Sequence, residues 1–412
     1  MYSPTIPTVD NTYYTDKCTE LEKCIEMNST LQEMKIVYDG KNETTSTIIS
    51  VIRGVTTNKT ITLLTIDASF IASPPPLPDG VIEQLLKDNN TLLALSLDIP
   101  DELLPSSLNI VEVNTPLTAL QIGIGQWSSS ELMTSSLLPH IKGLHCLILH
   151  DPYPPHLLFL SHPSLHTLTL PLDTAESAIE LFTILQTNTT LKALSVEIKE
   201  ERVYTSSMGT SLQDMLTQNQ TLKYLEINSS YRHFIFGPED IPSSFLSFLT
   251  TGLRHNTSLQ QLSVSIPLNE EIRTFINVIS QKNNLTELEV NFNPDQSYSN
   301  CSSEEKKQIM TPLFYEQVLP AVTNMLQSHT TIRLLGIVCR DINKMSSQPN
   351  WIELVQYLYE TIFIHPSLEY IEIKAGIITP PLLVDTLKDQ KKTLIDRHRK
   401  EQPHKPLPIV NF

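Results

Sequence analysis

Six histidines fall within one short stretch of this 412-residue chain, and clustered imidazoles raise the question of metal binding. They are His140, His145, His150, His156, His162 and His166. Imidazole nitrogen is a common zinc ligand, but a structural zinc site needs about four ligands at regular spacing. Here the spacings are loose, and the nearby thiol and carboxylate partners are limited to Cys146 and Asp151. We therefore interpret these histidines as turn and surface residues, and we expect no metal.

Motifs for catalysis or cofactor binding do not occur in the sequence. There is no G-x-x-x-x-G-K-[ST] loop and no G-x-G-x-x-G turn, and the chain has only 11 glycines with which to build a phosphate cradle. There is also no G-x-S-x-G elbow and no H-E-x-x-H pair. We therefore predict that the protein is not an enzyme and that it uses no cofactor.

Charge and cysteine usage narrow the classes of partner and compartment. The formal net charge of -16 argues against binding to nucleic acid or to anionic membranes, which requires a Lys/Arg surface. An odd, scattered set of five cysteines predicts free thiols rather than a disulfide framework. The N-terminus lacks a signal-peptide pattern, and no stretch approaches about 18 uninterrupted apolar residues. These features predict a cytoplasmic protein that, if it binds a macromolecule, binds a basic protein.

A recurrent phrase determines the architecture that must position any functional side chain. The phrase is a polar turn followed by L-x-x-L-x-aliphatic, and it is clearest at 188–196, 219–227 and 256–264. Its first aliphatic residue is found at Leu31, Ile61, Leu92, Leu117, Leu144, Leu165, Leu191, Leu222, Leu259, Leu285, Ile332 and Leu368. The mean spacing is about 31 residues. A repeated segment cannot bury its apolar face alone, so it must stack on its neighbours.

The phrase resembles leucine-rich repeats of the long, helix-containing kind, as in ribonuclease inhibitor, the Ran GTPase-activating protein and nucleotide-binding leucine-rich-repeat receptors. The resemblance covers about residues 28–376. It implies an α/β fold: a right-handed solenoid, or horseshoe, with parallel strands on the concave face and helices and loops on the convex face. We expect an N-terminal tail and cap over 1–27, about twelve repeats over 28–376, and a C-terminal capping helix and tail over 377–412.

Several helices and turns can be predicted from local pattern. Ser302 and Glu305 form a capping-box pattern ahead of a helix over about 303–326, and Asp173 resembles the cap of the helix that follows it. N-x-[ST] sequons recur in the turn before the strand, at Asn28, Asn58, Asn89, Asn188, Asn219, Asn256 and Asn284. Asn side chains bond local backbone in turns, so we favour a structural role for these sequons over glycosylation. His162, His329 and His365 occupy the same turn position in other repeats.

Strand alternation predicts the binding face. The second and third aliphatics of each phrase point into the core, so the residues just before, between and after them face outward. In the second half these positions are largely acidic, with two tyrosines and an apolar strip. The candidate partner-binding residues are Glu197, Tyr224, Glu226, Glu287, Glu289, Leu334, Val338, Tyr370 and Glu372. In the first half the same positions, such as Ala94, Ser96, Gln121 and Thr169, are mostly neutral.

Three functional hypotheses follow. We favour a non-catalytic protein-binding scaffold that recognises a basic partner on the concave face, with no contribution from nucleic acid or membrane. The resemblance allows two alternatives: the ligand-sensing portion of a nucleotide-binding innate immune receptor, and a GTPase-activating protein. The last of these depends on fold analogy alone, because no catalytic residue can be transferred from that family.

Overall fold

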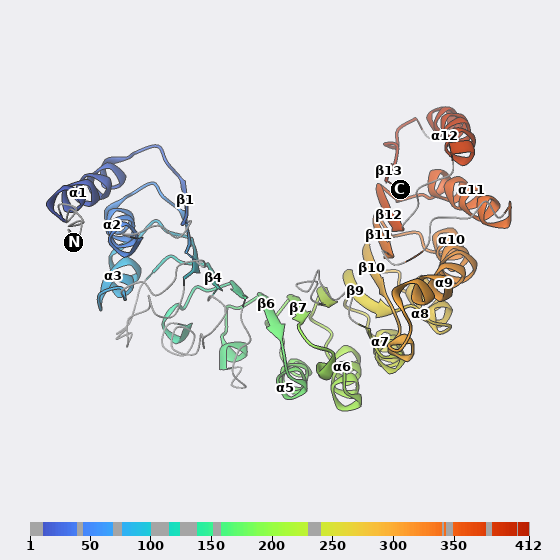
Figure 1. Ribbon diagram of the computed structural model, residues 1–412, viewed down its shortest axis with the longest axis horizontal. Coiled ribbons are helices and arrows are strands. Elements are labelled where there is room, and N and C mark those ends of the chain that lie inside the picture. The colour runs from blue at the N-terminus through green and yellow to red at the C-terminus, as the bar shows by residue number, and fades with distance from the viewer. Residues whose placement is uncertain are drawn as a thin grey trace, which may run out of the picture. The chain divides into compact units, whose positions relative to one another are not determined.

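The computed structural model describes residues 11–38, 44–68, 76–99, 115–123, 138–150, 158–229, 240–339, 342, 349–375, 381–401 and 403–411. Thirteen β-strands lie within these residues, and they follow one another in chain order. The chain divides into two compact units, Met1–Leu170 and Pro171–Phe412. In both units parallel strands alternate with helices, as expected for leucine-rich-repeat-like stacking (Figure 1).

Among its described residues, the first unit has α-helices toward its N-terminal end and short 3-10 turns farther along. Its elements are α1 (Asn11–Met27), β1 (Glu33–Val37), α2 (Thr44–Thr57), β2 (Leu63–Asp67), α3 (Val81–Asp88), β3 (Ala94–Asp98), β4 (Ala119–Gly123), η2 (Leu138–His140), β5 (Cys146–Leu149) and η3 (Leu158–Ser161). The next strand, β6 (Thr167–Leu172), contains the unit boundary. Strands β1 to β6 pair in parallel, each with the next along the chain.

The second unit has a helix in most connections between strands. Its elements are α5 (Ala175–Leu185), β7 (Ala193–Ile198), η4 (Glu201–Val203), α6 (Ser206–Gln218), β8 (Tyr224–Ser229), α7 (Ser243–His255), β9 (Gln261–Pro267), α8 (Ile272–Ser280), β10 (Glu287–Asn293), η5 (Gln296–Tyr298), α9 (Ser303–Leu313), η6 (Phe314–Val318), α10 (Leu319–Ser328), β11 (Leu334–Cys339), α11 (Pro349–Ile364), β12 (Tyr370–Ala375), α12 (Pro381–Glu401) and β13 (Ile409–Asn411). Strands β7 to β13 pair in parallel and in chain order.

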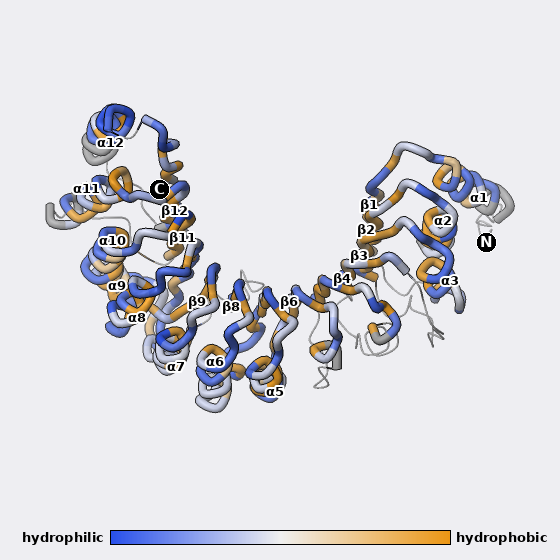
Figure 2. Tube along the Cα trace, turned by 180° about the vertical axis from the view of Figure 1, so that it is seen from behind, coloured by the Kyte–Doolittle hydropathy of each residue, from blue (hydrophilic) through white to orange (hydrophobic). Residues whose placement is uncertain are grey.

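The repeat phrase predicts the strands closely. Each of the twelve anchor aliphatics, from Leu31 to Leu368, stands two residues before the first residue of a strand. The second and third aliphatics are buried in almost every strand; in β8, for example, Leu225 and Ile227 have no exposed surface. Apolar residues line both the strands and the helices of each unit (Figure 2). A thirteenth strand, β13, comes from the C-terminal tail, outside the repeat pattern.

The helix signals are confirmed in part. Ser302 caps α9 in a complete capping box with Glu305, and helical structure continues from 303 to 328. A π-helical turn, η6, interrupts this stretch just before Pro320, which lacks a backbone N–H for the normal helical bond. The expected cap at Asp173 is wrong. The Thr174 hydroxyl accepts the backbone N–H of Ser177 instead, so the helix begins one residue later.

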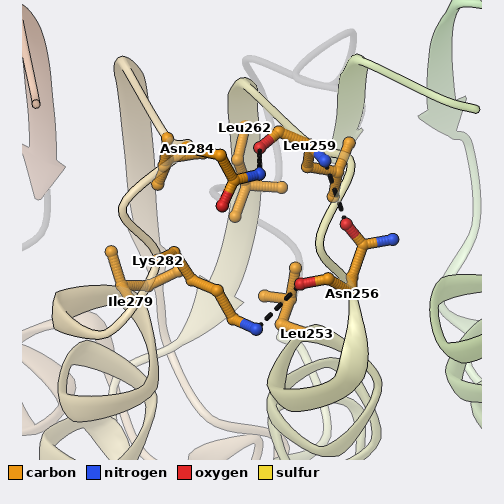
Figure 3. A pocket seen from close by; sticks show the side chains of 8 residues that line it. Leu253, Asn256, Leu259, Leu262, Ile279, Lys282 and Asn284 are labelled. Atoms are coloured by element: carbon orange, nitrogen blue, oxygen red, sulfur yellow. Dashed lines mark hydrogen bonds between the residues drawn. The ribbon is translucent and has the colours of Figure 1, made fainter. Parts of the chain in front are cut away.

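The polar turns stack into a hydrogen-bonded column, which we call the turn spine. In the second unit it consists of Asn188, Asn219, Asn256, Lys282, His329, His365 and Lys405. Each side chain after the first donates to the backbone carbonyl of the spine residue before it. Figure 3 shows Lys282 donating to the Asn256 carbonyl at 2.8 Å, beside a pocket between the two turns. The spine therefore joins successive repeats away from the strands.

Asparagine and histidine have the same bonding role in the spine. Asn256 Oδ1 accepts the backbone N–H groups of Ser258 and Leu259, both at 3.0 Å, while its Nδ2 donates backwards. His365 Nδ1 accepts the N–H of Leu368 at 2.9 Å, and its Nε2 lies 2.6 Å from the carbonyl oxygen of His329. Only a neutral imidazole offers one acceptor and one donor. In the first unit Asn58 and Asn89 bond in the asparagine pattern, so these sequon amides serve the fold.

We predict that acid weakens the second unit through two spine histidines. Burial lowers the pKa of His329 and His365, and for His365 the nearby Lys405 lowers it further. In the unfolded chain the histidine pKa is about 6.5, so below that pH the unfolded chain binds more protons than the folded chain. The contribution of these two histidines to the free energy of unfolding should therefore be fully present above about pH 6.5 and decrease as the pH falls below that value.

Urea unfolding at a series of pH values, followed by circular dichroism, measures this effect. The double variant His329→Asn/His365→Asn, which installs the amide used by other repeats, should have a flatter profile in this range. His255→Asn, at an exposed helix end, is the matched control. A double variant with the wild-type pH profile would contradict the prediction.

Candidate partner-binding face

The outward positions of strands β7 to β12 form the candidate site, called the acidic face below. Cross-strand register aligns them in rows. One row runs Ala193, Tyr224, Gln261, Glu287, Leu334 and Tyr370, and the next runs Ser195, Glu226, Ser263, Glu289, Gly336 and Glu372. Adjacent strands lie about 4.8 Å apart, so neighbours within a row can contact each other. The structure thus brings the predicted acidic and tyrosine residues onto one surface of the second unit.

Glu226 is held by donors from its own chain. Its Oε2 accepts the hydroxyls of Ser195 at 2.6 Å and Tyr224 at 2.8 Å, and its Oε1 accepts Asn228 Nδ2 at 2.6 Å. Partial burial, followed by this bond and the nearby carboxylates, raises the pKa of the Tyr224 phenol. Tyr224 therefore remains a protonated donor, and Glu226 has its main acceptor positions occupied.

Two further glutamates of the face lie beside lysines. Lys199 Nζ is 2.6 Å from Glu197, and Lys374 Nζ is 2.9 Å from Glu372. Each lysine stands two residues after its glutamate, Lys374 within β12 and Lys199 directly after the end of β7, and in extended chain that spacing places both side chains on the same side. These contacts reduce the negative field that Glu197 and Glu372 offer to a partner.

Glu287 and Glu289 differ from the other carboxylates of the face. Within the part of the chain that the structure describes, neither accepts a hydrogen bond or lies in an ion pair. The hydrogen bonds to Glu369 raise the pKa of Arg333, and the more distant charge of Glu287 adds to this effect. The guanidinium itself donates to both Glu369 oxygens, at 2.8 and 2.9 Å, and not to Glu287. The Glu289 side chain packs against the backbone of Gly336. A Cβ added at Gly336 would lie 3.1 Å from Glu289 Cγ. Among the described residues of the face, Glu287 and Glu289 are therefore the carboxylates without a compensating partner.

The apolar strip differs from the prediction. Leu334 is 36% exposed and Tyr370 is half-buried, as expected for a contact surface. Val338 is only 6% exposed, so its place in an exposed strip is wrong. Ser263 and Ser265, which alternation places at outward positions of β9, are also buried, at 7% and 0% exposed. Alternation predicts which side a residue faces, but not what lies over it.

Sequence reasoning missed Ile409. This residue lies on β13, opposite Tyr370 in the parallel register, and is 64% exposed. The alternation of apolar residues in the tail (LPIVNF) was the available signal, but the tail lacks the repeat phrase. Ile409 extends the apolar part of the face by one strand.

The clustered histidines that the structure describes do not converge on one point. His145 and His166 rings have centroids 5.2 Å apart, His150 Nε2 lies 2.7 Å from Gln121 Nε2, and His162 bonds the Ile141 carbonyl in a turn. Among the described residues there is no group of three possible metal ligands. Asp151 and His156 fall outside the described residues. None of the five cysteines forms a disulfide in the structure.

Comparison with known proteins adds little to this geometry. No protein-family model matches the chain, and no curated protein matches it. Among solved structures, the chain is similar to one described as leiomodin-1 actin-binding site 2, with 13% identity, 58% of this chain and 91% of that chain covered, and a TM-score of 0.23. At that TM-score the likeness supports no argument about function. Within the described residues, no helix has the length and apolarity needed to cross a membrane.

Proposed function

We propose that this chain is a non-catalytic protein-binding scaffold that recognises a basic protein partner on the acidic face. The observation that supports the proposal is the pair Glu287 and Glu289. They occupy successive outward positions of β10, and no described residue neutralises them by a hydrogen bond or an ion pair. Unpaired carboxylates at an open face attract a cationic partner and repel an acidic one.

The surroundings of this pair favour a protein as the ligand. Tyr224 and Tyr370 lie in the same row as Glu287, two strands to either side. Tyrosine and arginine are enriched at interface hot spots, and an arginine can stack on a tyrosine while it pairs with a carboxylate. The network around Glu226 holds Tyr224 in place, which reduces the ordering cost of binding.

The repeat type is part of the same proposal. Connections such as α6 and α7, each of 13 residues, support the long, helix-containing kind of leucine-rich repeat, as in ribonuclease inhibitor and nucleotide-binding receptors. In that kind of repeat the strand surface is the usual position for a bound protein.

Charge reversal tests the proposal. Proteins retained by the immobilised chain are identified, purified, and titrated against the chain by calorimetry. The variant Glu287→Lys/Glu289→Lys should weaken binding about tenfold or more, because it places like charges opposite the partner. Affinity for the wild-type chain should also fall as salt concentration rises.

A matched control separates the local effect from net charge. Glu316→Lys/Glu353→Lys makes the same change in net charge at exposed helix positions. This control should bind like the wild-type chain. Equal affinities for wild type and Glu287→Lys/Glu289→Lys, with circular dichroism unchanged, would exclude the acidic face as the binding surface.

A further inference from the structure

Three strands at the C-terminal end of the second unit present an apolar row on the same surface. Leu334 pairs with Tyr370 across β11 and β12, and Tyr370 pairs with Ile409 across β12 and β13. Leu334 is 36% exposed and Ile409 is 64% exposed. Because residues in register on parallel strands point to the same side, these three side chains form one row.

This apolar row is continuous with the unpaired carboxylates. Glu287 is the register partner of Leu334, so the row reads Glu287, Leu334, Tyr370 and Ile409. Three strand spacings of about 4.8 Å place Ile409 about 14 Å from Glu287. In the next row the Glu289 side chain lies against the backbone of Gly336, so this carboxylate extends from β10 toward β11, the strand that carries Leu334.

Charges along the margin are already compensated. Arg333 and Glu369 precede Leu334 and Tyr370 and pair in a two-pronged contact at 2.8 and 2.9 Å. Lys374 is 2.9 Å from Glu372. The uncompensated negative charge therefore lies at the β10 end of the row, and the β13 end presents an apolar side chain.

We propose that this surface takes a basic–apolar segment of the partner protein. Such a segment has an arginine or lysine over Glu287 and Glu289, and apolar side chains over Leu334, Tyr370 and Ile409. The proposal rests on the proposed function and adds the composition and polarity of the bound segment. A span of about 14 Å corresponds to about four residues of extended chain or about nine residues of helix. A second copy of this acidic face would be repelled by the same carboxylates.

Selection from a random peptide library tests the composition. Peptides retained by the immobilised full-length chain at low salt should carry a basic residue with apolar residues within about nine positions of it. Retained peptides without a basic residue, or without apolar neighbours, would overturn the proposal. An enriched peptide is then synthesised and titrated against variants of the chain.

Two substitutions test the apolar row directly. Leu334→Ser and Ile409→Ser should each weaken the peptide about tenfold, whereas Val37→Ser, a 59% exposed residue on β1, should have no effect. Leu334 lies inside the sheet between β10 and β12, so its variant remains informative if Ile409→Ser detaches β13. Hydrogen exchange of the β12 and β13 amides reports such detachment.

The combined outcomes separate this inference from the proposed function. Weakening by Glu287→Lys/Glu289→Lys without weakening by Leu334→Ser would overturn the basic–apolar segment and leave a basic partner in place. Weakening by Leu334→Ser without an effect of charge reversal would overturn both, because the carboxylates would then have no role in recognition.

Discussion

Replacing Asn256 with alanine should lower the free energy of unfolding of the second unit by about 3 kcal/mol or more. The amide side chain is 3% exposed and makes four hydrogen bonds to backbone. Its Nδ2 donates to the carbonyls of Leu216 at 2.8 Å and Asn219 at 3.1 Å, and its Oδ1 accepts two N–H groups of the following turn. Alanine leaves these buried groups without partners, and each costs about 1–3 kcal/mol.

Histidine provides a specific rescue of this position. Asn256→His supplies one acceptor and one donor in the arrangement that His329 and His365 use, so it should be less destabilising than Asn256→Ala. Asn277→Ala, at an exposed position of α8, is the control and should change stability by less than about 0.5 kcal/mol. Urea unfolding followed by circular dichroism gives the three values. If Asn256→Ala proved as mild as Asn277→Ala, the turn spine would have no energetic importance.

The second large effect is expected at the ion pair between Lys306 and Asp240. Lys306 Nζ lies 2.7 Å from both Asp240 oxygens, and the two side chains are 18% and 8% exposed. Lys306→Met leaves a buried carboxylate without its cation, which should cost about 3 kcal/mol. Removing both charges, in Asp240→Asn/Lys306→Met, should recover most of that loss, because no uncompensated charge then remains.

Hydrogen exchange should show that the loss of stability in Lys306→Met is local to the backbone contacts of Ile241, the residue after Asp240. Ile241 donates its N–H to the Pro294 carbonyl and accepts the N–H of Gln296, both at 3.0 Å. Next to it Asp295 accepts Ser243 Oγ at 2.5 Å and Asn269 Nδ2 at 2.9 Å. Amides of Ile241 and Gln296 should exchange faster in Lys306→Met. Lys307→Met removes a neighbouring lysine without an ion pair among the described residues, and should leave both stability and exchange unchanged.

Hydrogen bonding also determines the charge state of the Asp295 carboxyl. Burial alone would raise the pKa of the Asp295 carboxyl, but bonds from Ser243, Ser297 and Asn269 outweigh it and lower the pKa. Asp295 therefore stays ionised in the folded chain. Its neighbours come from α7, from the loop before α8 and from η5, so one carboxylate links three connections that are separate in the sequence.

The sequence by itself determined the repeat architecture of this protein. The spacing of aliphatics within each phrase located the strands β1 to β12, and alternation gave the side on which Glu226, Glu287 and Glu289 lie. Both are local properties, because strand alternation and the stacking of a repeat depend on residues a few positions apart. The capping box at Ser302 was predictable for the same reason.

Only the tertiary structure decided which of these side chains are available to a partner. Glu226 is occupied by Ser195 of the preceding repeat, Val338 is buried, and Glu289 lies over Gly336 of the following repeat. Ile409 joins the face because the tail pairs with β12, although no repeat phrase marks it. Each of these outcomes depends on contacts between residues of different repeats. Local periodicity gives the direction of a side chain but not the neighbour that it meets.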